Sequence, residues 1–150
     1  MESVDTYQII LWMHYFVSAS FLIIAVWLLF RAIYGVKNNL PYLPLDKILA
    51  YAFIINLYLQ LLFGLILFSN LSFAPNYGYQ SADGSIAMAS KRLWPIEHIV
   101  LMLFALFIAN LGLIFSSKSS IAKQKHRKIL IYYMVSILLI ASSLASIYFF

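Results

Sequence analysis

The chain has 150 residues, of which 64% are hydrophobic and only 10% are charged, and its mean hydropathy is +0.91. A soluble domain is about half apolar and about a quarter charged, so a soluble fold is excluded and a single membrane domain over residues 1–150 is expected. The absence of cysteine excludes disulfides, iron–sulfur clusters and thiolate metal sites. The net charge of +5 does not indicate a nucleic-acid partner, because the basic residues lie between apolar stretches.

Four apolar stretches follow one another along the chain, covering residues of about 7–30, 48–68, 93–115 and 129–149. Each has about 20 or more residues, which at 1.5 Å per residue crosses a hydrocarbon core of about 30 Å. Alternation with a period of two is absent, which excludes a β-barrel. The sequence therefore predicts an all-α integral membrane four-helix bundle, because helices satisfy their own backbone polar groups in lipid.

The connections differ in charge. The segments after the first and third stretches hold eight of the ten basic residues, namely Arg31, Lys37, Lys47, Lys118, Lys123, Lys125, Arg127 and Lys128. The positive-inside rule then predicts that both termini lie on the outer side of the membrane. The long segment 69–92 becomes an outer loop, and its Gly, Pro, Asn and Tyr content favours an ordered cap at the interface.

Two histidines lie inside apolar stretches at matched depth. His14 is about seven residues into the first stretch, or roughly 10 Å deep, and His98 is about six residues into the third, or roughly 9 Å deep. Either one alone is explained by ordinary hydrogen bonding. Two imidazoles that face each other across a helical bundle are suitable axial ligands for a haem iron, so His14 and His98 are the candidate metal ligands of a b-type haem.

Three further residues extend this candidate cofactor site. Gly64 falls near the same depth and presents bare backbone to a flat ligand, although plain helix packing also explains it. Met102 lies one turn after His98 on the same helix face. Arg92, at the membrane surface, is a candidate partner for haem propionates. Aromatic residues that would wall a porphyrin, or form an ordinary aromatic belt, are Trp12, Tyr15, Phe16 and Phe63.

Other polar residues have simpler explanations. Asn56 and Gln60 share one face of the second stretch, which predicts hydrogen bonds between helices, with a quinone or proton path as the alternative. Glu97 is interpreted as an interfacial hydrogen-bonding residue or, alternatively, a proton-relay acid. His126 lies in a basic segment and is expected to be solvated or to face lipid. The serine- and alanine-rich last stretch suits close packing, either within the bundle or against another subunit.

Copper or zinc is the rival ligand of the histidine pair. Met13, Met88 and Met102 together with the two histidines are donors that suit Cu(I). The sequence has no Met-x-x-Met cluster, and a zinc site usually has three or four protein ligands. Haem is therefore the preferred cofactor.

Three segments, "LDKILAYAFIINLYLQLLFGLILF", "ASKRLWPIEHIVLM" and "KHRKILIYY", resemble the matching parts of small four-helix bacterial inner-membrane proteins labelled cytochrome b-like. The resemblance places family positions at His14, Gln60, Gly64, Arg92, Trp94, Glu97 and His98. It implies a multi-pass protein of the bacterial inner membrane, so the outer side that the loop charges predict for both termini is the periplasm. One position departs from the family pattern, because Tyr58 stands where the family has a histidine.

These observations together predict a b-type cytochrome-like membrane protein that holds one haem between the first and third helices. It would serve electron transfer or accompany a respiratory complex, with the bilayer and other membrane subunits as partners. Two axial histidines leave no open iron position, which favours electron transfer over enzymatic catalysis. The alternatives are a cofactor-free structural or assembly subunit and, second, a haem-dependent membrane oxidase.

Overall fold

The computed structural model describes residues 2–70 and 85–149, with side chains for residues 6–70 and 95–145. These residues form four helices, which are α1 (Glu2–Asn38), α2 (Pro44–Ser69), α3 (Ser85–Ser117) and α4 (Ala122–Phe149). Each helix contains a stretch that is long and apolar enough to cross a membrane. The prediction of an all-α transmembrane four-helix bundle is confirmed.

The helices extend beyond the predicted spans. α1 continues past Phe30 to Asn38, and α3 begins at Ser85, so an outer loop over the whole of 69–92 is wrong for residues 85–92. Residues 71–84 of that loop lie outside the described part of the chain. Hydropathy marks the part of a helix that lies in hydrocarbon, whereas the backbone hydrogen bonds continue into the interface, where water solvates the polar side chains.

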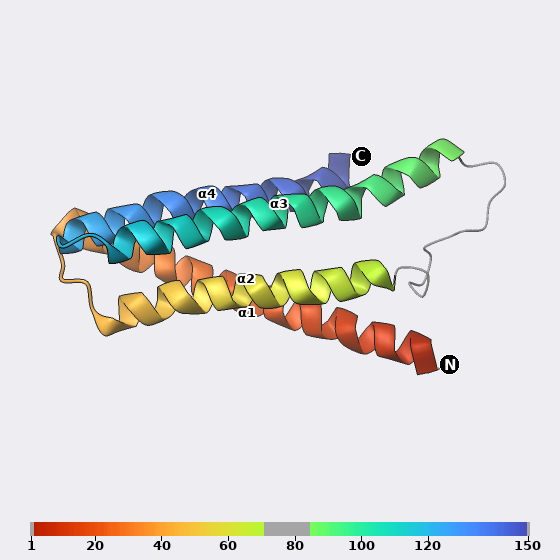
Figure 1. Cartoon of the computed structure of the whole chain (residues 1–150), viewed down its shortest axis with the longest axis horizontal. Helices are drawn as coiled ribbons and strands as arrows, with labels where there is room; N and C mark the ends of the chain where they lie inside the picture. Colours follow the sequence, from red (N-terminus) through yellow and green to blue (C-terminus); the bar gives the residue numbers. More distant parts are fainter. Residues whose placement is uncertain (1, 71–84, 150) are drawn as a thin grey trace.

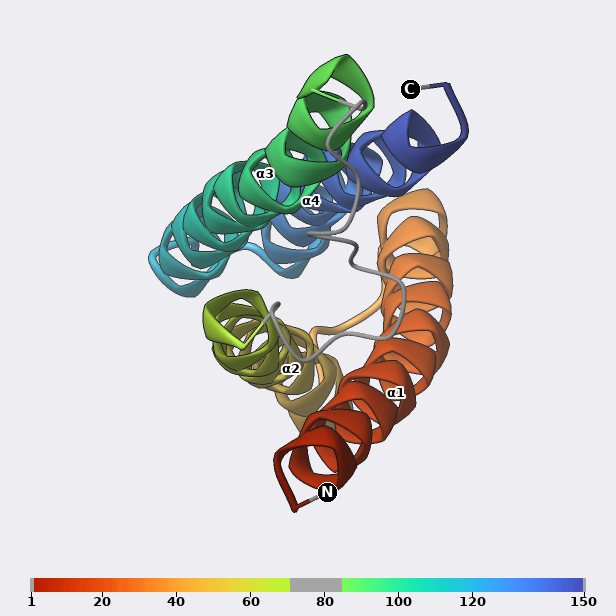
Figure 2. The same ribbon diagram turned by 90° about the vertical axis from the view of Figure 1, so that its right-hand side faces the viewer.

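The four helices close a ring in which each helix has two neighbours. The main contacts join α3 to α4 and α1 to α2, and contacts between α1 and α4 and between α2 and α3 complete the ring. In the side view the α1–α2 and α3–α4 connections lie at one end of the bundle, and both termini lie at the other (Figure 1). Seen end-on, α1 and α2 form one half of the ring and α3 and α4 the other (Figure 2). The helices in each half therefore run antiparallel, as the short connections require.

The α1–α2 connection is fixed by local hydrogen bonds. Asn39 adopts a left-handed backbone conformation with φ 51°, and the Leu40 N–H donates to the Gly35 carbonyl at 3.1 Å, which closes the end of α1. Pro44 is the first residue of α2. The N–H of a residue at this position has no acceptor within the helix, so proline, which lacks the N–H, costs no hydrogen bond there. The Leu43 N–H donates to the Asp46 carboxylate at 2.8 Å, so the connection has a defined start and end.

An aromatic stack forms the centre of the core. The Phe53 ring lies between Phe21, with ring centroids 4.8 Å apart, and Tyr133, with centroids 4.5 Å apart. The Tyr133 hydroxyl donates to the Ala50 carbonyl at 3.1 Å, which satisfies its only buried polar group. The stack links α1, α2 and α4, and small residues such as Ala105 let α3 approach closely.

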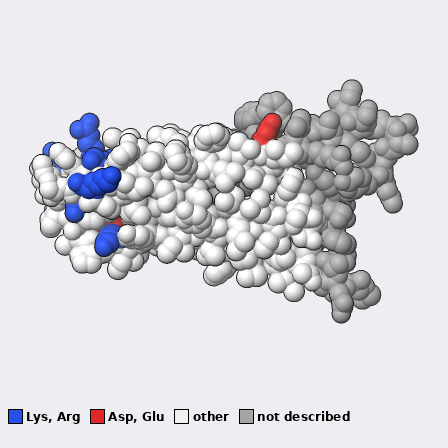
Figure 3. Space-filling model, in the orientation of Figure 1, with Lys and Arg blue, Asp and Glu red and all other residues white. Residues whose placement is uncertain are grey.

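The outer surface matches a lipid environment. Large apolar side chains are exposed along all four helices, whereas the described Lys and Arg side chains gather at the end that carries the connections (Figure 3). Charged groups are costly in hydrocarbon, so this end belongs at one membrane surface. The side of the membrane that each end faces stays a prediction.

Candidate functional site

His14 lies in α1, in the half of the bundle that carries the termini, and its side chain is half-buried. A Cβ placed on Gly64 of α2 would lie 3.9 Å from its Cε1, so the imidazole faces the bare backbone of that glycine. The Nδ1 atom is buried and has no hydrogen-bond partner among the described residues. Buried polar atoms are almost always satisfied, so this nitrogen has capacity for a partner from outside the described residues.

His98 lies in α3, one turn after Pro95, and is also half-buried. Its Nδ1 lies 2.7 Å from the Ser143 Oγ of α4, and Ser143 is buried. A histidine that binds a metal through Nε2 usually makes such a bond through its other nitrogen, which fixes the tautomer and the orientation of the ring. The serine-rich face of α4 thus supplies a partner for His98, a role that sequence analysis had attributed only to packing.

The two histidines come from opposite positions in the ring of helices, because α1 and α3 each contact α2 and α4. Both lie in the half of the bundle nearest the termini, where Gly64 of α2 faces the His14 ring and Ser143 of α4 contacts the His98 ring. Their pairing across the bundle stays a prediction. Two imidazoles, one with an unsatisfied buried nitrogen and one held by a serine, form a donor set that fits axial coordination of haem iron.

Hydrogen bonds between α1 and α2 continue from His14 toward the middle of the membrane. Gln60 Nε2 donates to the Ser18 Oγ at 2.7 Å, and Asn56 Nδ2 donates to the Ser20 Oγ at 2.7 Å. Gln60 also lies 3.4 Å from the His14 carbonyl oxygen. The predicted interhelical hydrogen bonds of Asn56 and Gln60 are confirmed. They hold the backbone of His14 against α2 and so position its ring.

The other members of the predicted site are placed differently. Met102 is buried and belongs to the hydrophobic core, one turn further along α3 than His98. Trp12 and Phe16 are 70% and 76% exposed, so they lie on the outward face of α1, as the aromatic-belt alternative expects. Phe63 is half-buried. The side chain of Arg92, the candidate propionate partner, lies outside the described residues.

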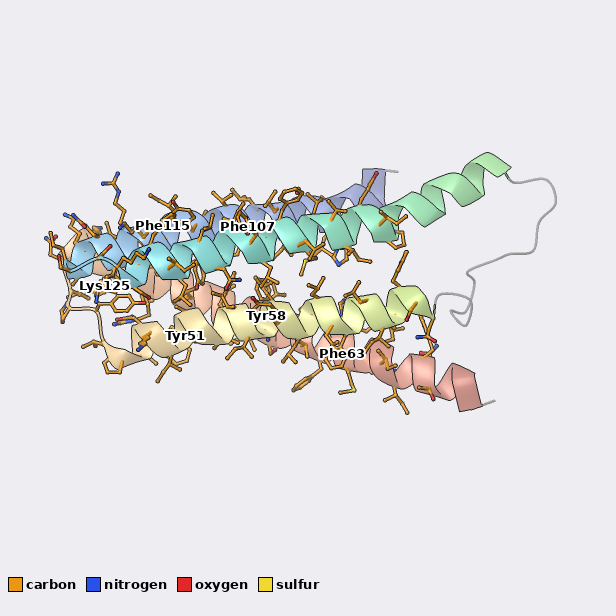
Figure 4. All side chains as sticks on the ribbon, in the orientation of Figure 1. Tyr51, Tyr58, Phe63, Phe107, Phe115 and Lys125 are labelled. Atoms are coloured by element: carbon orange, nitrogen blue, oxygen red, sulfur yellow. The ribbon has the colours of Figure 1, made fainter. Side chains whose placement is uncertain are left out.

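Tyr58 is the position at which the resemblance described above would expect a further histidine. It lies on α2 (Figure 4), and Asn110 Nδ2 of α3 lies 3.4 Å from its hydroxyl oxygen. Its side chain is 52% exposed. Tyr58 is two turns from Gly64 along α2, or roughly 9 Å, so it lies deeper in the membrane than the His14 ring.

His126 was expected to be solvated or to face lipid, and this expectation is wrong. The residue is 1% exposed, and its ring lies against Gly35 of α1 and near Tyr42, with ring centroids 4.9 Å apart. Extending the helical period of α4 backwards from Tyr133 and Ile129 places His126 on the buried face. That signal was present in the sequence, but the neighbouring lysines and arginine obscured it.

Within residues 6–70 and 95–145, no three His, Cys, Asp or Glu side chains cluster as metal ligands. Comparisons of this chain with protein-family models, with curated proteins and with solved structures found no match. The resemblance to cytochrome b-like proteins therefore stays a prediction that rests on the quoted segments. What is shown is a four-helix bundle, apolar on the outside, with two histidines in the half nearest the termini.

Proposed function

We propose that this protein is a b-type cytochrome-like component of a bacterial inner membrane, with His14 and His98 as the axial ligands of one haem. It would transfer electrons or accompany a respiratory complex. The observation that carries the proposal is the buried Nδ1 of His14, which lacks a partner among the described residues although His98 is held by Ser143.

The chain's own residues would bind and orient the group. Ser143 accepts or donates at Nδ1 of His98 and so limits rotation of that ring. Gly64 lies opposite the edge of His14 and leaves room that a larger side chain would fill. Gln60 and Ser18 contact the His14 carbonyl oxygen and fix the backbone of α1 at this level. Bound haem would supply a one-electron iron centre, which His14 and His98 would hold.

The first test is a set of reduced-minus-oxidised absorption spectra from protein purified in mild detergent with haem supplied. Wild type is expected to give a low-spin b-type spectrum, because both axial positions are filled. His14→Ala and His98→Ala are each expected to lose the spectrum or to become high-spin. A colourless wild type would contradict the proposal.

The third histidine of the chain provides a matched control. His126 lies against Gly35 at the opposite end of α1 from His14, so His126→Ala is expected to keep the low-spin spectrum. If His126→Ala behaves like the other two variants, the loss reflects general damage to the bundle and not removal of a ligand. Comparing the three histidine variants thus separates coordination from folding.

A cofactor-free structural or assembly subunit is the second candidate. The observation in its favour is that hydrogen bonds within the chain already explain Asn56, Gln60, Ser136 and the Nδ1 of His98. Such a protein would co-purify with a larger membrane complex and show no haem spectrum. The same spectra therefore decide between the two candidates.

A further inference from the structure

The basic end of the bundle holds two kinds of cation. One kind is engaged within the protein. Arg31 donates to Asp46 through two bonds of 2.8 and 3.0 Å, and Lys128 Nζ donates to the Phe115 carbonyl and the Ser119 Oγ. Lys125 Nζ lies 5.6 Å from the ring centroid of Tyr42. These side chains cap or join helix ends, so their charges have a structural explanation.

The other kind faces outward. Lys37, Lys47, Lys118, Lys123 and Arg127 are all exposed, and within the described residues none of them pairs with an acidic side chain. Lys123 lies one turn before Arg127 on the same face of α4. We call Lys37, Lys47, Lys118 and Arg127, one from each helix or helix end, the basic collar. Asp46, the acidic residue of this end, is already engaged by Arg31. The positive charge of the collar therefore needs counterions from outside the chain.

Each member of the basic collar comes from a different helix or helix end, and each continues a lipid-facing stripe. On α4, Arg127 precedes the exposed Ile131 and Val135 at intervals of four residues, which places the three side chains on one face. On α2, Lys47 precedes the exposed Tyr51 and Ile55 at the same intervals, and its Nζ lies 5.9 Å from the Tyr51 ring centroid.

The remaining two helices repeat the arrangement. On α1, the rings of Phe30 and Tyr34 stack in parallel with centroids 6.0 Å apart, and Lys37 follows one turn later. Below them the outer face of α1 carries a shallow apolar hollow of about 620 Å³, lined by residues from Leu22 to Phe30. On α3, the exposed Ile114 precedes Lys118 by four residues.

We propose that the basic collar binds the headgroups of anionic phospholipids and so enriches them in the lipid shell around the bundle. A cation at the head of an apolar stripe matches a phospholipid, whose negative phosphate lies directly above its acyl chains. Long basic side chains extend to the interface and keep their charge in contact with headgroups. Because four such positions surround the bundle, the preference applies around its circumference.

Tryptophan quenching by brominated lipids measures this preference. Trp27 is 49% exposed on the lipid-facing side of α1, about ten residues or roughly 15 Å from Lys37 along the helix. The reporter protein carries Trp12→Phe and Trp94→Phe, so that Trp27 alone is quenched. It is reconstituted into phosphatidylcholine vesicles that contain phosphatidylglycerol, with bromine on the acyl chains of one lipid or the other.

The expected result is a preference for phosphatidylglycerol of about five-fold for each cation that engages a headgroup at low salt. In 1 M salt, where the screening length is about 3 Å, the preference should disappear. Replacing all four collar residues and Lys123 by glutamine should reduce it to about one. The charge-conserving control replaces these four lysines by arginine and Arg127 by lysine, and it should retain the preference.

Three results would overturn the proposal. If both brominated lipids quench Trp27 equally in the protein with the wild-type collar, the collar does not select anionic lipid. Its charges would then serve membrane orientation or bind an acidic protein partner. An unchanged preference in the glutamine variant would place the lipid contact elsewhere. If inorganic phosphate abolishes the preference but chloride of equal ionic strength does not, the collar binds free phosphate and is not specific for lipid headgroups. If the glutamine variant does not accumulate, the salt series on the protein with the wild-type collar tests the proposal, and a preference that persists in 1 M salt would contradict it.

Discussion

Gly35 of α1 lies directly against His126 of α4. A Cβ on residue 35 would lie 2.6 Å from three ring atoms of His126, which is shorter than any ordinary carbon contact. The imidazole is buried and its Nε2 has no partner among the described residues, so the ring is held by shape and by its contact with Tyr42. Burial raises the pKa of the Tyr42 phenol, which keeps this neighbour neutral.

This contact predicts the effect of a single methyl group. Gly35→Ala is expected to lower the free energy of unfolding by about 1–3 kcal/mol, because the ring cannot retreat without moving a helix. Thermal unfolding in detergent, followed by circular dichroism, measures the change. Adding His126→Ala to the Gly35→Ala variant should recover part of the loss, since the clashing ring is then absent.

Gly64 is the matched control for this prediction. A Cβ there would meet only His14 Cε1, at 3.9 Å, which is an ordinary van der Waals distance. Gly64→Ala is therefore expected to leave the unfolding midpoint nearly unchanged. Equal stability of the Gly35→Ala and Gly64→Ala proteins would show that α1 and α4 are less closely packed than the structure indicates.

At the scale of helices, polar side chains decide which helices are held together at which level. Gln60 and Asn56 bond to hydroxyls of α1, and Ser136 Oγ donates to the Ala105 carbonyl of α3 at 2.8 Å. At the connections, Asp46 does two things at once, because it accepts from the Leu43 N–H and pairs with Arg31. The pair joins the end of α1 to the start of α2.

Breaking this pair tests its contribution. The side chain of Asp46 is 3% exposed and that of Arg31 is 20% exposed, so the interaction is partly screened by solvent. Asp46→Ala is expected to cost about 1–3 kcal/mol of unfolding free energy, since it removes the helix cap and leaves Arg31 unpaired. Chemical or thermal unfolding in detergent provides the measurement.

A double variant distinguishes the two contributions of Asp46. Arg31→Leu combined with Asp46→Leu removes both charges and is expected to be less destabilised than Asp46→Ala alone, because no charge is left unpaired. Both variants lack the acceptor for the Leu43 N–H, so a double variant that is no more stable than Asp46→Ala would show that the unpaired charge of Arg31 costs little. Asp46→Asn, which keeps an acceptor oxygen for the Leu43 N–H, then isolates the cap.

For the whole molecule, the distribution of charge sets the orientation. The connections and their cations lie at one end of the bundle, and both termini lie at the other. The positive-inside rule predicts that the basic end lies in the cytoplasm. Because the natural chain contains no cysteine, a single introduced thiol reports the side of any chosen position without background.

Cysteine labelling therefore tests the orientation directly. In intact cells, a membrane-impermeant maleimide is expected to label Ser3→Cys and to leave Ser120→Cys unlabelled until the membrane is opened. Ser120 is an exposed residue of the connection between α3 and α4, so access by the reagent is limited only by the membrane. The reverse labelling pattern would place both termini in the cytoplasm and would contradict the predicted orientation.

The sequence alone determined the number of helices, their membrane-spanning character and the end at which the charges gather. These properties depend on composition and on stretches of about 20 residues. Their prediction is reliable because it averages over many side chains. It also predicted the hydrogen bonds of Asn56 and Gln60, because polar amides inside a membrane must find partners on neighbouring helices. The helix ends were underestimated, since hydropathy does not mark where backbone hydrogen bonding stops.

Only the tertiary structure decided how each helix is rotated about its axis. Rotation buries His126 against Gly35 although its sequence neighbours are charged, and it turns Trp12 and Phe16 outward although they flank His14. It also brings Ser143 to His98, two residues that are far apart in the chain. Packing of whole faces sets these rotations, and each face depends on side chains from several helices at once.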